Sequence, residues 1–142
     1  MSGAVKNARR GMFPARAAEL GDLKSFLEGF CVEAGVAKDR RLRLNVVLEE
    51  LFLNTVKHGY RGDSVAPVWV SLAAEAEAMQ VTYEDTAPPF NPYAWLSSGS
   101  PDATSALLKV GGLGVLLTRE LAATRDYTYL FGRNRIRLTL AR

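Results

Sequence analysis

A helical stretch in the middle of the chain carries polar residues whose types and spacing suit a functional site. In LNVVLEELFLNTVKHGYRGD, one face at helical spacing carries four of them: Glu50, Asn54, Lys57 and Arg61. The amide oxygen of Asn54 can contact Mg²⁺, a hard cation that prefers oxygen ligands and usually keeps several waters. Glu50, one turn away, can orient or deprotonate a nucleophile. Because E-x-x-x-N is also common on solvated helices, the pair alone leaves a plain surface helix open.

Two further segments add complementary chemistry. Asp85 ends the alternating stretch MQVTYED, and a carboxylate there can accept a hydrogen bond from the exocyclic amino group of adenine. Alone, it is equally an aspartate that ends a strand in a turn. Prolines stiffen the loop that follows, and Phe90 either packs beside a base or simply anchors the loop. In GGLGVLLTREL, glycines directly precede a helix, so that backbone N–H groups and the helix dipole favour an anion. The phosphate-contacting positions would be Gly111, Gly112 and Gly114, and the segment alone leaves a flexible hinge or a plain helix-start turn open.

Hydrophobic periodicity predicts the elements that must position these residues. On the second helix it predicts a core face of Leu44, Leu48, Leu51, Phe52 and Thr55, and in VWVSLAA it places Val68, Val70 and Leu72 on one side of a strand. The first half of the chain is predicted to form a short edge strand ending near Phe13, a helix ending at Gly35, a second helix from an N-cap at Asp39 to Gly59, and a hairpin of strands 68–74 and 79–85. A long loop (86–102) and a third helix (112–121) follow. The chain ends in a second hairpin, with strands 126–131 and 135–141 and a turn at 132–134. Hairpins mixed with helices predict an α+β fold. It is a two-layer α/β sandwich with a mixed or antiparallel sheet and helices on one face, not a Rossmann domain.

Composition bounds the class of protein. The 142 residues fit one domain, 1–142, and the hydrophobic fraction of 48% is ordinary for a globular chain. The single cysteine, Cys31, is expected to be a small buried side chain. The N-terminus lacks a signal-peptide apolar region, which predicts a cytoplasmic protein, and no apolar run is long enough for a membrane span. The net charge of +3 comes from scattered basic residues, so a nucleic-acid surface is not expected.

The three motifs together, in this order and spacing, resemble the N box and the two glycine boxes of the GHKL (histidine-kinase-like) ATPases. Within that superfamily, LNVVLEELFLNTVKHGY, EDTAPPFNP and GGLGVLL are most similar to the stand-alone anti-sigma-factor serine/threonine kinases. The C-terminal GRNRIRLTL also resembles their final hairpin. The resemblance extends from about Phe13 to Leu140 and implies a Bergerat-type ATP-binding fold.

The resemblance also implies residue roles. Asn54 would be the Mg²⁺ ligand, Glu50 the general base, and Asp85 the partner of the adenine amino group. The loop 97–111 would be the ATP lid. The remaining implied nucleotide contacts are Lys57, Ala87, Phe90, Gly111, Gly112, Leu113 and Gly114, and His58 and Arg61 would be further phosphate or lid contacts.

The implied activity is ATP- and Mg²⁺-dependent phosphorylation of a STAS-type anti-anti-sigma protein, with a sigma factor as a further partner and a homodimer as the assembly.

One position departs from the family pattern. The motif D-x-G reads Asp85-Thr86-Ala87 in this chain, and alanine resists a positive φ. The departure favours an alternative, a non-catalytic nucleotide-binding module that sequesters a partner. A plain ATPase is the third interpretation, and the lack of a transducer domain argues against it.

Overall fold

The computed structural model describes residues 7–93, 118 and 121–142. Strand β1 (Asn7–Pro14) leads through a short 3₁₀ turn, η1 (Ala17–Glu19), into helices α1 (Leu20–Glu33) and α2 (Lys38–Asn54). Helix α2 continues as a π-helical turn, η2 (Thr55–Gly59). The strands that follow are β2 (Pro67–Ala74), β3 (Ala78–Asp85), β4 (Ala122–Leu130) and β5 (Arg133–Ala141).

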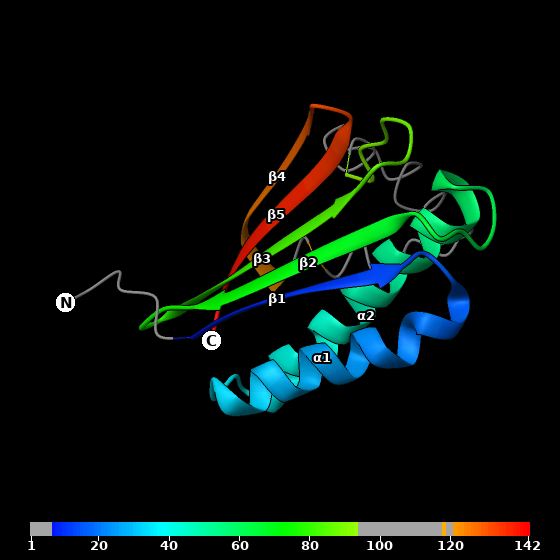
Figure 1. The fold of residues 1–142 in the computed structure, drawn as a ribbon. Helices are drawn as coiled ribbons and strands as arrows, with labels where there is room; N and C mark the ends of the chain where they lie inside the picture. The colour runs from blue at the N-terminus through cyan, green and yellow to red at the C-terminus, as the bar shows by residue number, and fades with distance from the viewer. Residues whose placement is uncertain (1–6, 94–117, 119–120) are drawn as a thin grey trace, which may run out of the picture.

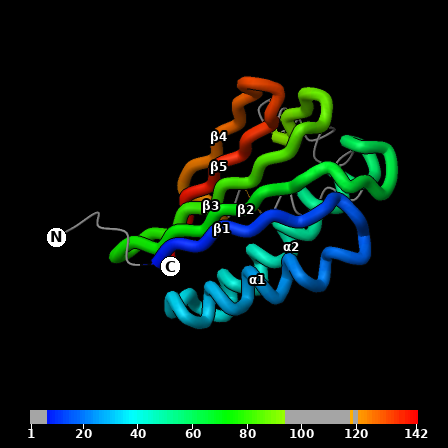
Figure 2. The backbone as a smooth tube through the Cα atoms, viewed as in Figure 1, coloured from blue at the N-terminus to red at the C-terminus, as the bar shows by residue number. Residues whose placement is uncertain are grey.

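The strands form one antiparallel sheet in the order β1-β2-β3-β5-β4. Helices α1 and α2 lie against one face of this sheet, while β1 lies at one edge and β4 at the other (Figure 1; the backbone trace in Figure 2 gives the same arrangement). The expected two-layer α+β sandwich is confirmed, and among the described strands every pairing is antiparallel.

The core lies between the helices and the covered sheet face. The apolar arc expected on the second helix is buried in full: Leu44, Leu48, Leu51, Phe52 and Thr55. Alternation buries every second side chain of β2 and most of those of β5, where Ile136, Leu138 and Leu140 point into the core. Cys31 is also buried, as expected, and burial raises its pKa to about 11, which leaves the thiol protonated near neutral pH.

Several boundaries differ from the expectations. Strand β4 begins at Ala122, four residues before the expected start at 126. Helix α2 begins at Lys38, with Ala37 at the N-cap position. Asp39 therefore lies in the first turn, where its negative charge interacts favourably with the helix dipole. The β4–β5 turn is Phe131-Gly132, not 132–134, because Leu130 pairs with Arg133 and the two turn residues take positive φ. Asn134 therefore belongs to β5 and not to a turn. The expected end of α1 at Gly35, which has φ +71°, is confirmed.

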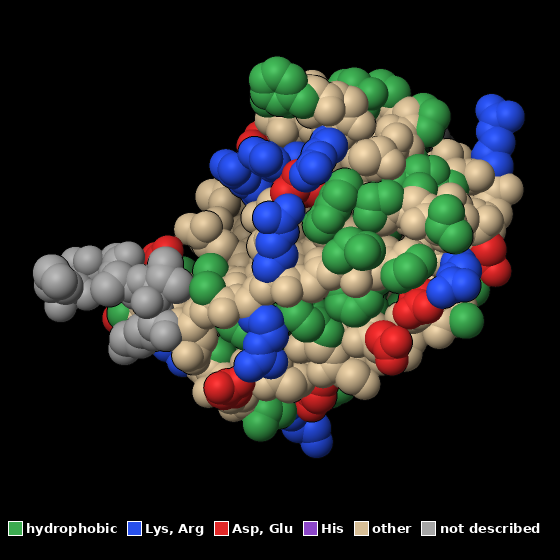
Figure 3. Space-filling view, in the orientation of Figure 1, with side chains coloured by type: hydrophobic (Ala, Val, Ile, Leu, Met, Phe, Trp, Pro, Cys, Tyr) green, Lys and Arg blue, Asp and Glu red, His purple; other side chains and the backbone are tan. Residues whose placement is uncertain are grey.

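The second sheet face carries no helix among the described elements. Basic side chains and a hydrophobic area lie over the strands in the space-filling view (Figure 3). The third helix expected over 112–121 falls mostly outside the described residues, and its two described members, Thr118 and Leu121, are helical. Within the described part of the chain, no helix combines the length and apolar character needed to span a membrane.

Candidate functional site

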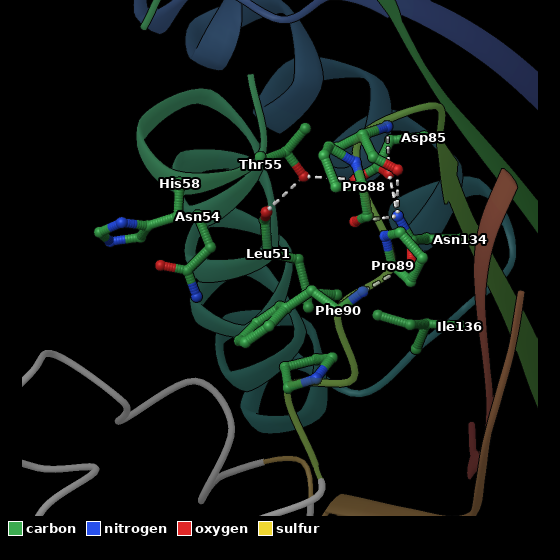
Figure 4. Close-up of a pocket in the computed structure, with 13 residues that line it drawn as sticks. Leu51, Asn54, Thr55, His58, Asp85, Pro88, Pro89, Phe90, Asn134 and Ile136 are labelled. Atoms are coloured by element: carbon green, nitrogen blue, oxygen red, sulfur yellow. Dashed lines mark hydrogen bonds between the residues drawn. The ribbon is translucent and has the colours of Figure 1, made fainter. Parts of the chain in front are cut away.

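A pocket of about 220 Å³ opens at the end of the sheet where β3 finishes beside α2 and its π-helical turn. The helix supplies one wall and the loop after β3, with β5, supplies the other (Figure 4). The lining residues are Leu51, Asn54, Thr55, His58, Gly59, Asp85, Ala87, Pro88, Pro89, Phe90, Pro92, Asn134 and Ile136. Most of this lining is apolar, and its polar groups belong to a few residues.

Asp85 is the buried acceptor of the pocket, with 6% of its surface exposed. Its Oδ1 accepts hydrogen bonds from Asn134 Nδ2 at 2.9 Å and from the backbone N–H of Ala87 at 3.1 Å. Its Oδ2 accepts one from the Thr55 hydroxyl at 2.8 Å. A carboxylate offers about four lone-pair directions, so one acceptor position remains, and it belongs to Oδ2.

Thr55 connects this carboxylate to the helix. Its Oγ1 lies 3.0 Å from the Leu51 carbonyl and 2.6 Å from the Tyr83 hydroxyl oxygen, which is itself 3.1 Å from Leu51 O. The single hydroxyl hydrogen of Tyr83 serves either the Thr55 oxygen or this carbonyl. Burial raises the pKa of Tyr83 well above its ordinary value, so the phenol stays protonated and acts as a donor in this network. Thr55 was expected only on the core face; its hydroxyl in addition fixes one oxygen of Asp85.

Asn134 is a site residue that the sequence interpretation missed. Its Nδ2 donates to Asp85 Oδ1 and lies within 2.9 and 3.1 Å of the carbonyls of Ala87 and Pro88. Its Oδ1 accepts from the Phe90 backbone N–H at 3.0 Å and from the Tyr127 hydroxyl. The side chain thus ties the first residues after β3, Ala87 to Phe90, to β5. The sequence did contain a signal for this role. Asn134 shares the strand face of Ile136, Leu138 and Leu140, and a polar side chain on a buried face needs a hydrogen-bond partner.

Ala87, the departure from D-x-G, fits this site because of Gly59. Ala87 is 3% exposed, and it is not among the described non-glycine residues with positive φ. A Cβ at Gly59 would lie 2.8 Å from the Ala87 Cβ, closer than real Cβ contacts come. Glycine at the end of the π-helical turn therefore makes the room that the alanine methyl needs, and the strain expected from alanine at this position is absent.

This close approach predicts that Gly59→Ala lowers the free energy of unfolding by about 1–3 kcal/mol through overpacking. Ala87→Gly in the same chain should restore most of that loss, because it removes the other methyl. Urea unfolding of the two single variants and the double variant measures the coupling. Gly21→Ala is the matched control, since a Cβ there meets nothing within 4 Å. If Gly59→Ala lowers the free energy of unfolding equally in the wild-type and the Ala87→Gly backgrounds, the contact between the two positions is contradicted.

The other predicted residues divide into three groups. Asn54, Asp85, Ala87 and Phe90 line the pocket together, as does His58. Glu50, Lys57 and Arg61 do not line it; Glu50 is half-buried one turn before Asn54, and Lys57 and Arg61 are exposed. The predicted lid and the residues Gly111, Gly112, Leu113 and Gly114 lie outside the described residues.

The charge environment of Glu50 differs from that of an ordinary surface glutamate. Burial raises its pKa, the nearby Lys57 ammonium lowers it, and the neighbouring Glu49 carboxylate raises it. The net direction is upward. A raised pKa is a common feature of carboxylates that act as general bases, the role that the family resemblance implies for Glu50.

The pocket residues fit an adenine nucleotide chemically. The apolar side chains of Leu51, Ala87 and Ile136 suit a flat heteroaromatic ring, and Phe90, 59% exposed, lies at the rim. The free acceptor position of Asp85 Oδ2 suits an exocyclic amino donor. The Asn54 amide oxygen, on the helix wall, is of the ligand type that Mg²⁺ accepts.

Comparisons with known proteins agree with this fold and identify its family. The model of the histidine kinase-like ATPase domain matches residues 13–140, and the chain belongs to this family. The serine-protein kinase RsbW of Bacillus licheniformis is 26% identical over 111 residues, which are 76% of this chain and 69% of that protein. The resemblance to anti-sigma-factor kinases drawn from the motifs is thereby confirmed.

Solved structures extend the likeness of the fold. The structure of the RsbU and RsbW domains of Rv1364c from Mycobacterium tuberculosis matches with a TM-score of 0.63 at 16% identity, over 96% of this chain and 33% of that one. The SiaB–SiaC complex from Pseudomonas aeruginosa matches with a TM-score of 0.58 at 12% identity, over 97% of this chain and 91% of that one. This chain thus corresponds to about a third of the Rv1364c chain.

Proposed function

We propose that this chain binds ATP with Mg²⁺ and transfers the γ-phosphoryl group to a serine or threonine of a STAS-type anti-anti-sigma protein, and so regulates a sigma factor. The observation that carries the nucleotide part is the buried Asp85 carboxylate. Three protein donors hold it, and one acceptor position is left free in an otherwise mostly apolar pocket. Similarity to the RsbW kinase of Bacillus licheniformis supports the kinase part.

In this proposal each residue has a defined task. Asp85 selects the base, the apolar wall excludes water from it, and Asn134 keeps the loop after β3 in place. Asn54 holds the metal ion, which when bound neutralises charge on the phosphates. Glu50 accepts the proton of the acceptor hydroxyl, and Lys57 contacts phosphate. Gly111 to Gly114 and the predicted lid 97–111 supply the phosphate cradle.

A non-catalytic binding module is the alternative that Ala87 favoured from the sequence. The space that Gly59 provides removes the steric reason for it. Phosphorylation of a partner protein separates the two functions, because a module that only sequesters a partner leaves it unmodified. A homodimer and a bound sigma factor are further parts of the proposal and follow from the type of relative alone.

Calorimetric titration of ATP and ADP, with and without Mg²⁺, tests the site. We expect Mg²⁺-dependent binding to the wild type, and a loss on the order of tenfold or more in Asn54→Ala, because a ligand to a charged centre is removed. Asn45→Ala is the matched control on the same helix, where the side chain makes only a 3.4 Å contact with the Arg41 carbonyl. No binding to the wild type at millimolar nucleotide would reject the proposal.

A further inference from the structure

The tip of the β4–β5 hairpin carries an aromatic residue that the fold itself does not explain. Phe131 and Gly132 form a two-residue turn between the paired Leu130 and Arg133, with φ values of +54° and +74°. Such turns favour asparagine or glycine at the first position, because the left-handed region strains a side chain with a Cβ. Phe131 is also 99% exposed, and Leu130 beside it is 58% exposed. Neither backbone geometry nor core packing therefore accounts for phenylalanine here.

Two arginines stand next to this apolar tip in fixed positions. The guanidinium of Arg133 lies 4.0 Å from the centre of the Trp69 ring. Arg133 and Arg135 share the buried Glu84 carboxylate, at 3.4 and 3.7 Å, while about 40% of each arginine side chain stays exposed (41% and 38%). Stacking and a shared counterion restrict the rotamers of these arginines, which lowers the entropy cost of binding a carboxylate.

The apolar and basic groups border one hollow. It measures about 360 Å³ and is lined by Thr128, Leu130, Phe131, Arg133 and Arg135. The hollow lies on the opposite side of β5 from the nucleotide pocket, because Asn134 points to the pocket and its two neighbours in the strand point away from it. The surface is therefore separate from the proposed nucleotide site and does not depend on it.

The chemistry of this hairpin surface (Leu130, Phe131, Arg133 and Arg135) selects its occupant. We propose that it binds an acidic segment of a partner protein, whose apolar side chain packs on Phe131 and Leu130 while its carboxylates pair with Arg133 and Arg135. Exposed apolar groups beside arginines are the composition of a protein-binding anchor, and the exposed charges of the hollow are positive.

Two other occupants fit less well. A second copy of this chain in a two-fold interface would bring the same arginines face to face, because an isologous interface uses the same patch on both subunits. An anionic membrane is better matched by freely projecting basic side chains than by arginines pinned to Trp69 and Glu84.

Selection from a displayed library of short random peptides on the immobilised full chain tests the proposal. We expect enriched peptides to combine acidic residues with a leucine or aromatic residue. Phe131→Asn should weaken their binding at least about tenfold, as expected for an anchor residue. Asparagine accepts the left-handed turn, so the variant should keep or raise the melting temperature. Arg133→Gln with Arg135→Gln should weaken binding similarly and reduce its dependence on salt.

Matched controls separate this surface from general stickiness. Val65→Asn removes another exposed apolar side chain, 87% exposed, and Arg43→Gln removes an exposed arginine of α2; both should bind as the wild type does. The proposal is overturned if no peptide is enriched, if the enriched peptides lack acidic residues, or if they bind Phe131→Asn unchanged. It is overturned equally if the wild type, but not Phe131→Asn, co-sediments with mixed phosphatidylcholine–phosphatidylserine vesicles while peptides fail to bind.

Discussion

We expect Glu50→Gln to bind ATP as the wild type does and to lose phosphoryl transfer to the partner protein by about 100- to 10,000-fold, the usual contribution of a general base. Glu50 does not line the nucleotide pocket, so its substitution leaves the base-binding wall unchanged. Its position one turn before Asn54 places it toward the proposed metal and phosphate end. Single-turnover transfer from labelled ATP to a purified STAS protein measures the rate, and calorimetry measures nucleotide affinity.

The neighbouring glutamate supplies a matched control. Glu49→Gln makes the same chemical change one position away, where the carboxylate pairs with Lys24 at 3.3 Å across a half-exposed surface. That variant should transfer phosphate at the wild-type rate, since an exposed ion pair contributes little. Equal rates in Glu50→Gln and Glu49→Gln would contradict the role of Glu50.

The pH dependence adds an independent test of the same residue. A base works deprotonated, and burial raises the pKa of Glu50. The transfer rate should therefore begin to fall with decreasing pH at a higher pH than an ordinary glutamate would produce. In Glu50→Gln this limb of the profile should be absent. A wild-type profile that stays flat below neutrality, down to the ordinary range of glutamate, would argue against Glu50 as the base.

The sequence predicted the layers well because periodicity reports burial directly. The arc from Leu44 to Thr55 and the alternation of Val68, Val70 and Leu72 were confirmed as core faces, since each repeats at the period of its element. Turn composition is a weaker signal. Gly132 marked the second hairpin, but strand pairing, which depends on residues far apart in sequence, decided that the turn begins at Phe131.

The site was predicted in part for the same reason. Asp85 ends a strand and stands in a motif, so it could be proposed from local sequence. Asn134 lies 49 residues later, and its role depends on pairing opposite Asp85 across β3 and β5. The close approach of Gly59 and Ala87 is likewise a contact between segments distant in sequence, and no local sequence pattern predicts it. Glu50 could be placed near Asn54 on a helix, whereas its distance from a substrate depends on a partner that the chain does not contain.

Asp85→Asn should lower ATP affinity by about 10- to 100-fold, the cost of losing a hydrogen bond to a charged acceptor. The variant should still fold. An amide oxygen in place of Oδ1 can accept from Asn134 and Ala87, and an amide nitrogen in place of Oδ2 can donate to Thr55. Thr55 can then turn its hydrogen to the Leu51 carbonyl, 3.0 Å away. Only the free acceptor position is lost, because the nitrogen now presents a donor to the donor of adenine.

Inosine triphosphate makes this expectation specific. Its base carries a carbonyl where adenine carries the amino group, so the wild-type Asp85 should discriminate against it and Asp85→Asn should accept it. We therefore expect the ratio of ATP to inosine triphosphate affinity to fall by at least tenfold in the variant. Asp126→Asn, which changes an exposed aspartate on β4, should leave the ratio unchanged. An unchanged ratio in a folded Asp85→Asn protein would mean that Asp85 serves only to hold Thr55 and Asn134 together, and the base would have to be recognised elsewhere.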